Sequence, residues 1–273
     1  MDLTDEIKSL IDKGESLVLC IIVDANGSAP RGVGAKMIVS SSGKTIGTVG
    51  GGAVELASIK EAKKLLETKK DLTKRFDLNP ETSKMETKGM LCGGDVTIDF
   101  KYIDKVNVDD FDFDSIAEVK PRAIIFGAGH VSAAVTPVLN HIGFDVVVCD
   151  NRKDLISSNA FTVAKQTLNC KYKEGIDQLN INNEDYVLIM TPAHIADYEV
   201  LSMTLKFKPK YIGCLGSPKK TKTIKEKLVN EDGHDKSLVD IIHMPIGLKM
   251  NSHTPEEIAI SIAGEMINVK NED

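Results

Sequence analysis

The stretch AIIFGAGHVSAAV, residues 123–135, decides the fold of the C-terminal half of this 273-residue chain. Its apolar start is typical of a buried strand, and its GAGH turn opens a helical pattern. In a strand followed by a glycine turn and a helix, Gly127 permits the tight turn, and Gly129 lets the backbone approach a pyrophosphate at the helix N-terminus. Ser132 and Ala133 replace the usual third glycine and are small enough for close helix–strand packing. The stretch predicts a nucleotide-binding Rossmann-type domain, and a plain strand-to-helix turn is the alternative.

Further apolar runs continue the pattern toward the C-terminus: DVVVC from Asp145, YVLIM from Tyr186 and YIGCL from Tyr211. Strands that alternate with helices imply a parallel sheet. Asp150 follows the first of these runs, about 20 residues after the glycine turn, where an acidic side chain hydrogen-bonds a ribose hydroxyl. Arg152 can instead hold a phosphate, so NAD and NADP both stay open as ligands. His130 and His194 either contact such a ligand or serve the fold alone.

The N-terminal half mixes helices and strands. Apolar periodicity predicts helices at residues 3–11 and 53–66 and strands at 16–23, 35–39, 45–49, 72–78 and 95–102. An acidic, weakly periodic stretch follows and is typical of an interdomain linker. The sequence therefore predicts an α/β protein with an N-terminal α+β domain at 1–103, an acidic linker at 104–121, and a Rossmann-like domain with a parallel sheet at 122–273.

Composition limits the class of protein and its partners. Apolar residues make up 42% and charged residues 27%, as in soluble globular proteins. No apolar run reaches the roughly 18 residues of a membrane span, and the N-terminus lacks a secretory signal, which predicts a cytoplasmic protein. The net charge of −6 argues against a nucleic-acid partner. Five widely spaced cysteines predict neither a disulfide framework nor a structural zinc site, and a homo-oligomer is left open.

Two glycine-rich loops stand out in the N-terminal half, GSAPRGVGAKM from Gly27 and GTVGGGAVE from Gly47. The second loop holds four glycines: Gly47, Gly50, Gly51 and Gly52. Without Cβ atoms, their backbone N–H groups are free to face an anion just before a helix. Arg31 of the first loop suits a phosphate, because its guanidinium is planar and bidentate. A flexible hairpin with a solvated arginine is the alternative.

Motifs from both halves occur in one order: GSAPRGVGAKM, GTVGGGAVE, LCGGDV, GAGHVSAAV, MPIGL and TPEEIAISIAGE. Together they span residues 27–265 and resemble the xanthine dehydrogenase accessory factor family, also called the XdhC/CoxI family. The resemblance implies a protein that binds molybdenum cofactor (molybdopterin), protects it, supports its sulfuration and helps insert it into a client molybdenum hydroxylase such as xanthine dehydrogenase. It also implies a Rossmann-like second domain, and a sulfur donor protein becomes a candidate partner.

The resemblance gives roles to the glycine loops and to one cysteine. The phosphate and pterin of the cofactor become the implied ligands of the loops at residues 27–34 and 47–52. Cys92 becomes a candidate metal ligand or sulfur carrier, because a thiolate is a soft ligand and a nucleophile. The neighbouring Gly93 and Gly94 leave it approachable. A small, buried, apolar residue is the alternative for Cys92.

Two functions follow from these observations. The first is a cytoplasmic maturation factor that binds molybdenum cofactor and delivers it to a client hydroxylase, rather than a turnover enzyme. The second is an NAD(P)-dependent oxidoreductase, in which the GAGH turn holds a dinucleotide and His130 or His194 carries a proton. The sequence supplies no clear catalytic pair for the second function. The first hypothesis predicts that the protein binds molybdenum cofactor more tightly than NAD(P), and the second predicts the reverse.

Overall fold

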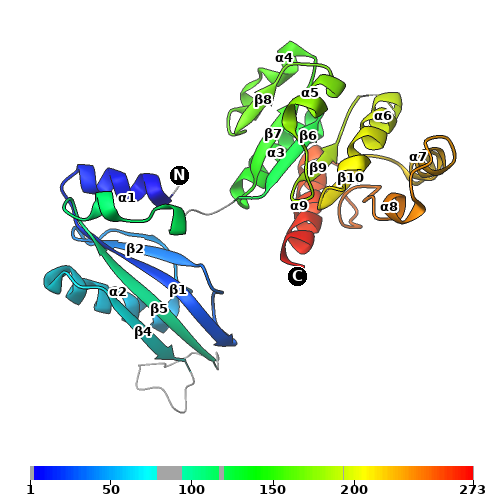
Figure 1. The fold of residues 1–273 in the computed structure, drawn as a ribbon. Coiled ribbons are helices and arrows are strands. Elements are labelled where there is room, and N and C mark those ends of the chain that lie inside the picture. The colour runs from blue at the N-terminus through cyan, green and yellow to red at the C-terminus, as the bar shows by residue number, and fades with distance from the viewer. Residues whose placement is uncertain (1–2, 79–93, 117–119, 193, 273) are drawn as a thin grey trace. The chain divides into compact units, whose positions relative to one another are not determined.

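The computed structural model describes residues 3–78, 94–116, 120–192 and 194–272. The chain divides into two compact units, Met1–Glu118 and Val119–Asp273 (Figure 1). Each unit contains a five-stranded sheet with its own buried core. Within the described ranges, no helix is long and apolar enough to cross a membrane.

The first unit is built on an antiparallel sheet in the order β3-β2-β1-β5-β4. Its strands are β1 (Leu17–Gly27), β2 (Lys36–Ser40), β3 (Thr45–Gly47), β4 (Leu72–Asp77) and β5 (Gly94–Ile103). Its helices are α1 (Leu3–Asp12) and α2 (Gly52–Thr68), and two 3-10 turns follow β5, η1 (Val108–Asp110) and η2 (Asp114–Ile116). Strand β1 continues past its predicted end at Val23, because it stays paired with β5 as far as Gly27 and Gly94.

The central strand β1 is buried on both faces of this sheet, which explains its unbroken apolar run. Val18 and Cys20 pack on the face that α2 covers. Leu17 and Leu19 pack on the opposite face, which α1 covers. Ile116 of η2 is buried in this second cluster, so part of the stretch predicted as an acidic linker packs on the first unit.

The second unit holds a parallel sheet in the order β10-β9-β6-β7-β8. Its strands are β6 (Arg122–Phe126), β7 (Asp145–Cys149), β8 (Gln166–Leu168), β9 (Tyr186–Ile189) and β10 (Tyr211–Cys214). Its helices are α3 (His130–His141), α4 (Lys153–Ile156), α5 (Tyr172–Leu179), α6 (His194–Thr204), α7 (Pro218–Asn230), α8 (Lys236–Asp240) and α9 (Pro255–Asn271), with 3-10 turns η3 (Asn159–Phe161) and η4 (Leu205–Phe207). A parallel α/β unit after an α+β unit confirms the predicted fold class.

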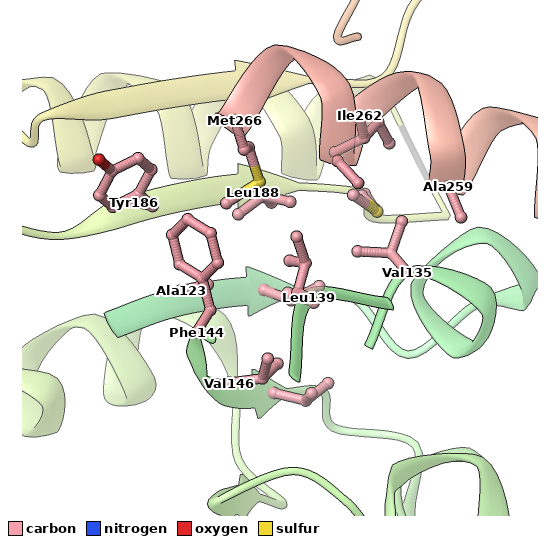
Figure 2. Packing of buried hydrophobic residues seen from close by; sticks show 14 of the residues in the cluster. Ala123, Val135, Leu139, Phe144, Val146, Tyr186, Leu188, Ala259, Ile262 and Met266 are labelled. Carbon is pink, nitrogen blue, oxygen red and sulfur yellow. The ribbon is translucent and has the colours of Figure 1, made fainter. Parts of the chain in front are cut away.

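Helices cover both faces of the parallel sheet. On one face, Val135 and Leu139 of α3 meet Ile262 and Met266 of α9 over the buried strands (Figure 2). Side chains from α5, α6, α7 and α8 pack on the other face. Each fully buried large apolar side chain contributes about 1.5–3 kcal/mol. These two layers fix the carboxyl edge of the sheet, where the glycine turn lies.

Candidate functional site

The turn after β6 depends on Gly127. Its φ is +112°, and a Cβ there would lie 2.3 Å from the carbonyl oxygen of Met190, just past the neighbouring strand β9. The Gly127 N–H donates to the carbonyl oxygen of Cys149, the last residue of β7, at 2.9 Å. The turn is thus tied to both strands that flank β6, and only glycine fits at this position.

At Gly129, packing within the chain does not explain the choice of glycine. Its backbone is extended, with φ −83° and ψ −175°, and a Cβ there would meet no atom of the chain within 4 Å. As the N-cap of α3 it offers no side-chain oxygen to the first N–H groups of that helix. The chain's own packing therefore does not require glycine at this position, whereas a ligand that approaches the backbone does.

A pocket of about 340 Å³ adjoins this turn. Its lining includes residues from the turn, from the segment after β7 and from the end of β9: Ala128, Gly129, His130, Arg152, Phe161 and Met190. The volume is at the lower end of the range for small-molecule sites. A guanidinium and backbone N–H groups beside an apolar wall suit a phosphate that carries a small organic group.

Asp150, for which a ribose hydroxyl is the expected partner, is fully buried. Its carboxylate accepts the backbone N–H of Ala128 at 2.7 Å and forms a bidentate ion pair with Arg152 at 2.9 and 2.6 Å. Burial raises the pKa of Asp150, but these hydrogen bonds and the guanidinium charge outweigh burial and lower that pKa overall. Asp150 therefore positions Arg152, and Arg152, with 37% of its side chain exposed, lines the pocket.

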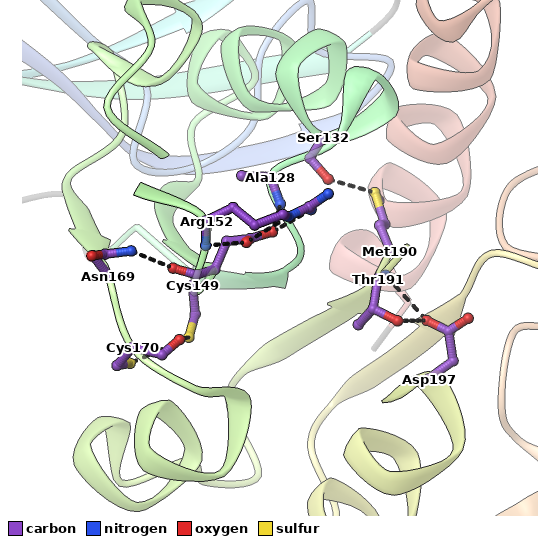
Figure 3. Close-up of polar contacts among 10 residues, drawn as sticks. Ala128, Ser132, Cys149, Arg152, Asn169, Cys170, Met190, Thr191 and Asp197 are labelled. Carbon is purple, nitrogen blue, oxygen red and sulfur yellow. Dashed lines mark hydrogen bonds and ion pairs between the residues drawn. The ribbon is translucent and has the colours of Figure 1, made fainter. Parts of the chain in front are cut away.

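A second polar cluster lies past the ends of β9 and β10. Asp197 accepts the backbone N–H and the hydroxyl of Thr191 at 3.1 and 2.6 Å (Figure 3) and forms an ion pair with Lys220. Lys220 also donates to the carbonyl oxygen of Leu215 at 2.7 Å. Because both charged side chains are nearly buried, the pair holds α6 and α7 to the strand ends. Lys220 could not be predicted from the sequence, because Lys219 and Lys220 are adjacent and differ only in the direction that α7 gives their side chains.

The three remaining predicted site residues are His130, His194 and Cys92. His130 is the first residue of α3 and lines the pocket beside the glycine turn. His194 begins α6, but its side chain is outside the described part of the structure. Cys92 also lies outside the described residues.

The four glycines of the loop at residues 47–52 adopt positive φ angles: +79° at Gly47, +120° at Gly50, +70° at Gly51 and +58° at Gly52. A Cβ on Gly47 would lie 2.4 Å from the carbonyl oxygen of Lys36, the neighbouring strand. A Cβ on Gly50 would lie 2.8 Å from the ring of Pro30. These two glycines therefore allow segments of the first unit to approach one another.

Two N–H groups of this glycine run are bound by the chain's own side chains. Gly50 donates to the hydroxyl oxygen of Thr48 at 3.0 Å, and Gly51 donates to the carboxylate of Glu55 at 3.1 Å. The Thr48 hydroxyl donates in turn to Glu55. Thr48 and Glu55 thus accept the two N–H groups that were predicted to face an external anion.

The glycine-containing segments of the first unit meet around the loop that carries Arg31. Gly50 packs against Pro30, on one side of that loop. A Cβ on Gly94 would lie 2.3 Å from the carbonyl oxygen of Asn26, at the start of the loop. Arg31 itself is exposed. The chain is therefore held in place just before Arg31, at Asn26 and Pro30, while the Arg31 guanidinium stays accessible.

Comparisons with known proteins identify both units. A family model described as the XdhC Rossmann domain matches residues 123–266, and another described as the XdhC and CoxI family matches residues 10–77. The Escherichia coli K12 protein YqeB, described as uncharacterized, is 28% identical over 99% of this chain, and the match covers 47% of YqeB. This chain thus spans about half the length of that relative.

Two further relatives match over most of their own length. One, from Bacillus subtilis 168, is described as a probable subunit of xanthine dehydrogenase and is 22% identical over 97% of this chain and 96% of the relative. The other, from Escherichia coli K12, is described as the molybdenum cofactor insertion chaperone PaoD, 23% identical over 94% of this chain and 84% of the relative.

The fold is shared with a solved structure. A crystal structure described as a xanthine dehydrogenase from Bacillus halodurans matches with a TM-score of 0.78 at 22% identity, covering 100% of this chain and 97% of that chain. One family model matches the second unit and the other matches the first, which confirms the resemblance seen in the ordered motifs. The chain belongs to the XdhC and CoxI family.

Proposed function

We propose that this chain binds molybdenum cofactor and inserts it into a molybdenum hydroxylase of the xanthine dehydrogenase type. Membership of the XdhC and CoxI family supports the proposal, as does similarity over 94% of the chain to a relative named as a molybdenum cofactor insertion chaperone. In this role the chain is a binding and delivery protein of the cytoplasm. Its proposed partners are the client hydroxylase and a sulfur donor protein.

The observation that carries the proposal is the anchored loop around Arg31. Gly50 and Gly94 hold this loop by close backbone approach, and Arg31 is exposed on it. A guanidinium binds a phosphate through two parallel hydrogen bonds, so the phosphate of the cofactor fits Arg31. The N–H groups of Gly50 and Gly51 are less suited to bind that phosphate, because Thr48 and Glu55 already accept their hydrogen bonds. We therefore assign the phosphate to Arg31 and a packing role to these glycines.

Cys92 is the proposed ligand or sulfur carrier. It precedes Gly94 by two residues in the sequence and lies outside the described residues. A thiolate is a soft ligand that suits molybdenum, and the Arg31 guanidinium suits the phosphate. When bound, the cofactor supplies the molybdenum centre that the client hydroxylase uses.

The pocket of the second unit is proposed to bind a nucleotide phosphate. Arg152 lines it, and Gly129 leaves the backbone of α3 accessible beside it. Because Asp150 is buried and paired with Arg152, the pocket presents a cation where a ribose-binding carboxylate was expected. This favours a phosphate at that position over a free ribose diol, as in NADP or in a nucleotide form of the cofactor. The oxidoreductase alternative places a nicotinamide in this pocket, with His130 as the proton carrier.

Anaerobic equilibrium binding to the full chain tests the proposal. Wild-type protein is titrated with molybdenum cofactor and, separately, with NAD and NADP. We expect the wild type to bind the cofactor and Arg31→Ala to bind it about tenfold more weakly, since one charge-assisted bidentate contact contributes roughly 1.5–3 kcal/mol. Arg75→Ala is the matched control, because Arg75 is another exposed arginine of the first unit, engaged with Asp95.

Cys92→Ser extends the same experiment. The substitution keeps the size of the side chain but removes the soft ligand, so cofactor retention and client activation should fall while thermal unfolding stays unchanged. A wild type that binds NAD(P) with a substrate-dependent absorbance change, and does not bind molybdenum cofactor, would replace the proposal by the oxidoreductase alternative.

A further inference from the structure

Two cysteines of the second unit lie in direct contact. Cys149 is the last residue of β7, and Cys170 precedes α5 by two residues; their Sγ atoms are 3.6 Å apart (Figure 3). A disulfide requires about 2.05 Å between sulfur atoms. Small side-chain rotations and a modest shift of the loop after β8 close that gap. The fold therefore holds these two thiols at a separation from which a disulfide forms readily.

The surroundings divide the roles of the two thiols. Cys149 is fully buried, and burial raises the pKa of its thiol. Cys170 is partly exposed, so a small oxidant reaches its sulfur first. Gly175 makes room for the pair, because a Cβ at that position would lie 2.5 Å from the Cys149 Sγ. The pair thus combines an accessible attacking thiol with a sheltered resolving thiol.

The pair is joined to the pocket by short hydrogen-bonded connections. Asn169, which precedes Cys170, donates its side-chain N–H to the carbonyl oxygen of Asp150 at 3.0 Å. Asp150, which follows Cys149, accepts the backbone N–H of Ala128 in the glycine turn. The Cys149 carbonyl oxygen accepts the N–H of Gly127 at 2.9 Å. A backbone shift at Cys149 or at Asn169 and Cys170 would therefore displace groups that hold the glycine turn in place.

We propose that Cys149 and Cys170 are a reversible thiol–disulfide site, oxidised by small-molecule disulfides, whose state alters the glycine turn at Gly127 and Ala128. In the first step the Cys170 thiolate attacks one sulfur of glutathione disulfide, forming a mixed disulfide and releasing one glutathione. Cys149 then attacks the Cys170 sulfur and releases the second glutathione. The two thiol protons go to the two released glutathione thiolates, and the two electrons reduce the glutathione disulfide.

Oxidation of the full-length chain tests this site. The experiment uses a Cys92→Ser background, which removes the thiol that lies outside the described residues. After exposure to excess glutathione disulfide without denaturant, mass spectrometry should find a protein two hydrogen atoms lighter, with the peptides of Cys149 and Cys170 cross-linked. Added Cys149→Ser should instead trap a glutathione adduct on Cys170. The buried cysteines Cys20 and Cys214 supply controls, because serine at either should leave the cross-link intact.

Amide hydrogen exchange then reads the effect on the turn without using any ligand. Oxidation should speed exchange in the segment at residues 127–133 about threefold, because the hydrogen bonds that protect Gly127 and Ala128 are strained. A segment of the first unit, residues 17–27, should be unaffected. The proposal is overturned if both thiols remain alkylatable after the oxidant while circular dichroism shows folded protein. It is equally overturned if the cross-link forms and exchange at the turn does not change.

Discussion

The glycine turns before helices α2 and α3 look alike in sequence but differ in what their N–H groups bind. Each helix has a glycine N-cap, Gly51 for α2 and Gly129 for α3. Four residues further on, α2 carries Glu55, whose carboxylate accepts the N–H of Gly51. At the same position α3 carries Ala133, which lines an adjoining pocket. The N–H of Gly51 is therefore bound by its own helix, whereas in the turn before α3 Gly127 and Ala128 donate to Cys149 and Asp150, outside the helix they precede.

This difference shows how far a glycine pattern can be interpreted. Glycines mark where the backbone adopts unusual angles or approaches another group, and both turns do so. They do not show whether the N–H groups are free, because that depends on acceptors supplied by other residues. An acidic residue one helical turn after the N-cap is the signal that distinguishes the two cases here.

The largest expected effect follows substitution of Gly127. Gly127→Ala combines a positive φ with a Cβ only 2.3 Å from the Met190 carbonyl oxygen, so we expect a loss of about 3 kcal/mol or more in the unfolding free energy of the second unit. Gly51→Ala is the matched control from the other turn, because its φ is +70° but its Cβ would meet no atom within 4 Å. That variant should lose less, about 1–3 kcal/mol, which is the cost of a Cβ at φ +70° and ψ −174° without any steric overlap.

Urea unfolding followed by near-ultraviolet circular dichroism measures the effect of Gly127→Ala. Four of the five tyrosines lie in the second unit and report on its packing: Tyr172, Tyr186, Tyr198 and Tyr211. Equal stability losses in the two alanine variants would show that the overlap at Met190 is relieved by movement of β9.

Gly129→Val should change binding rather than stability. Its backbone is extended and the space around it is open, so the unfolding free energy should change by no more than about 0.5 kcal/mol. Calorimetry with ADP should show affinity reduced about a hundredfold, because the branched side chain blocks backbone approach of a phosphate. If the wild type does not bind ADP at millimolar concentration, the pocket does not bind adenine nucleotides. If wild type and variant bind equally, the nucleotide contacts other residues.

The smallest effect is expected at the occupied turn. Glu55→Ala removes a negative charge and frees the Gly51 N–H, so affinity of the first unit for inorganic phosphate should rise about tenfold, as expected for one freed donor at a helix N-terminus. Glu61→Ala, on the same helix but paired with Lys74, is the control. Phosphate titration followed by ³¹P line broadening compares the two variants. An equal response from both would assign the change to net charge alone.

Strongly periodic segments were predictable from the sequence, because burial of one face leaves a pattern of apolar residues. The start of α9 was predictable as well, since Thr254 and Glu257 form a capping box around Pro255 in the first turn of the helix. Strand β8 left no such signal, because the side chains of Gln166–Leu168 are mostly exposed at the edge of the sheet. Residues 104–116 were predicted from their acidity as linker, while the burial of Ile116 depends on apolar neighbours far away in the sequence.

The site was predictable only in part. The turn at Gly127 and the candidate ligand-binding positions Asp150 and Arg152 followed from their places after predicted strands, whereas their ion pair did not. The sequence did not show which of the two side chains lines the pocket. That depends on the buried position of Asp150, whose carboxylate accepts a hydrogen bond from Ala128, 22 residues earlier in the chain. The contact between Cys149 and Cys170, 21 residues apart, left no trace in their spacing.

The local geometry and the family of this protein could be predicted from its sequence alone. Apolar periodicity, glycines at turns and the order of the motifs are properties of neighbouring residues, so they can be identified before the chain is folded. Only the tertiary structure decided which polar groups the protein uses for itself and which it leaves accessible. Hydrogen bonds and close contacts depend on distances of about 3 Å between segments that are remote in sequence, and packing alone sets those distances.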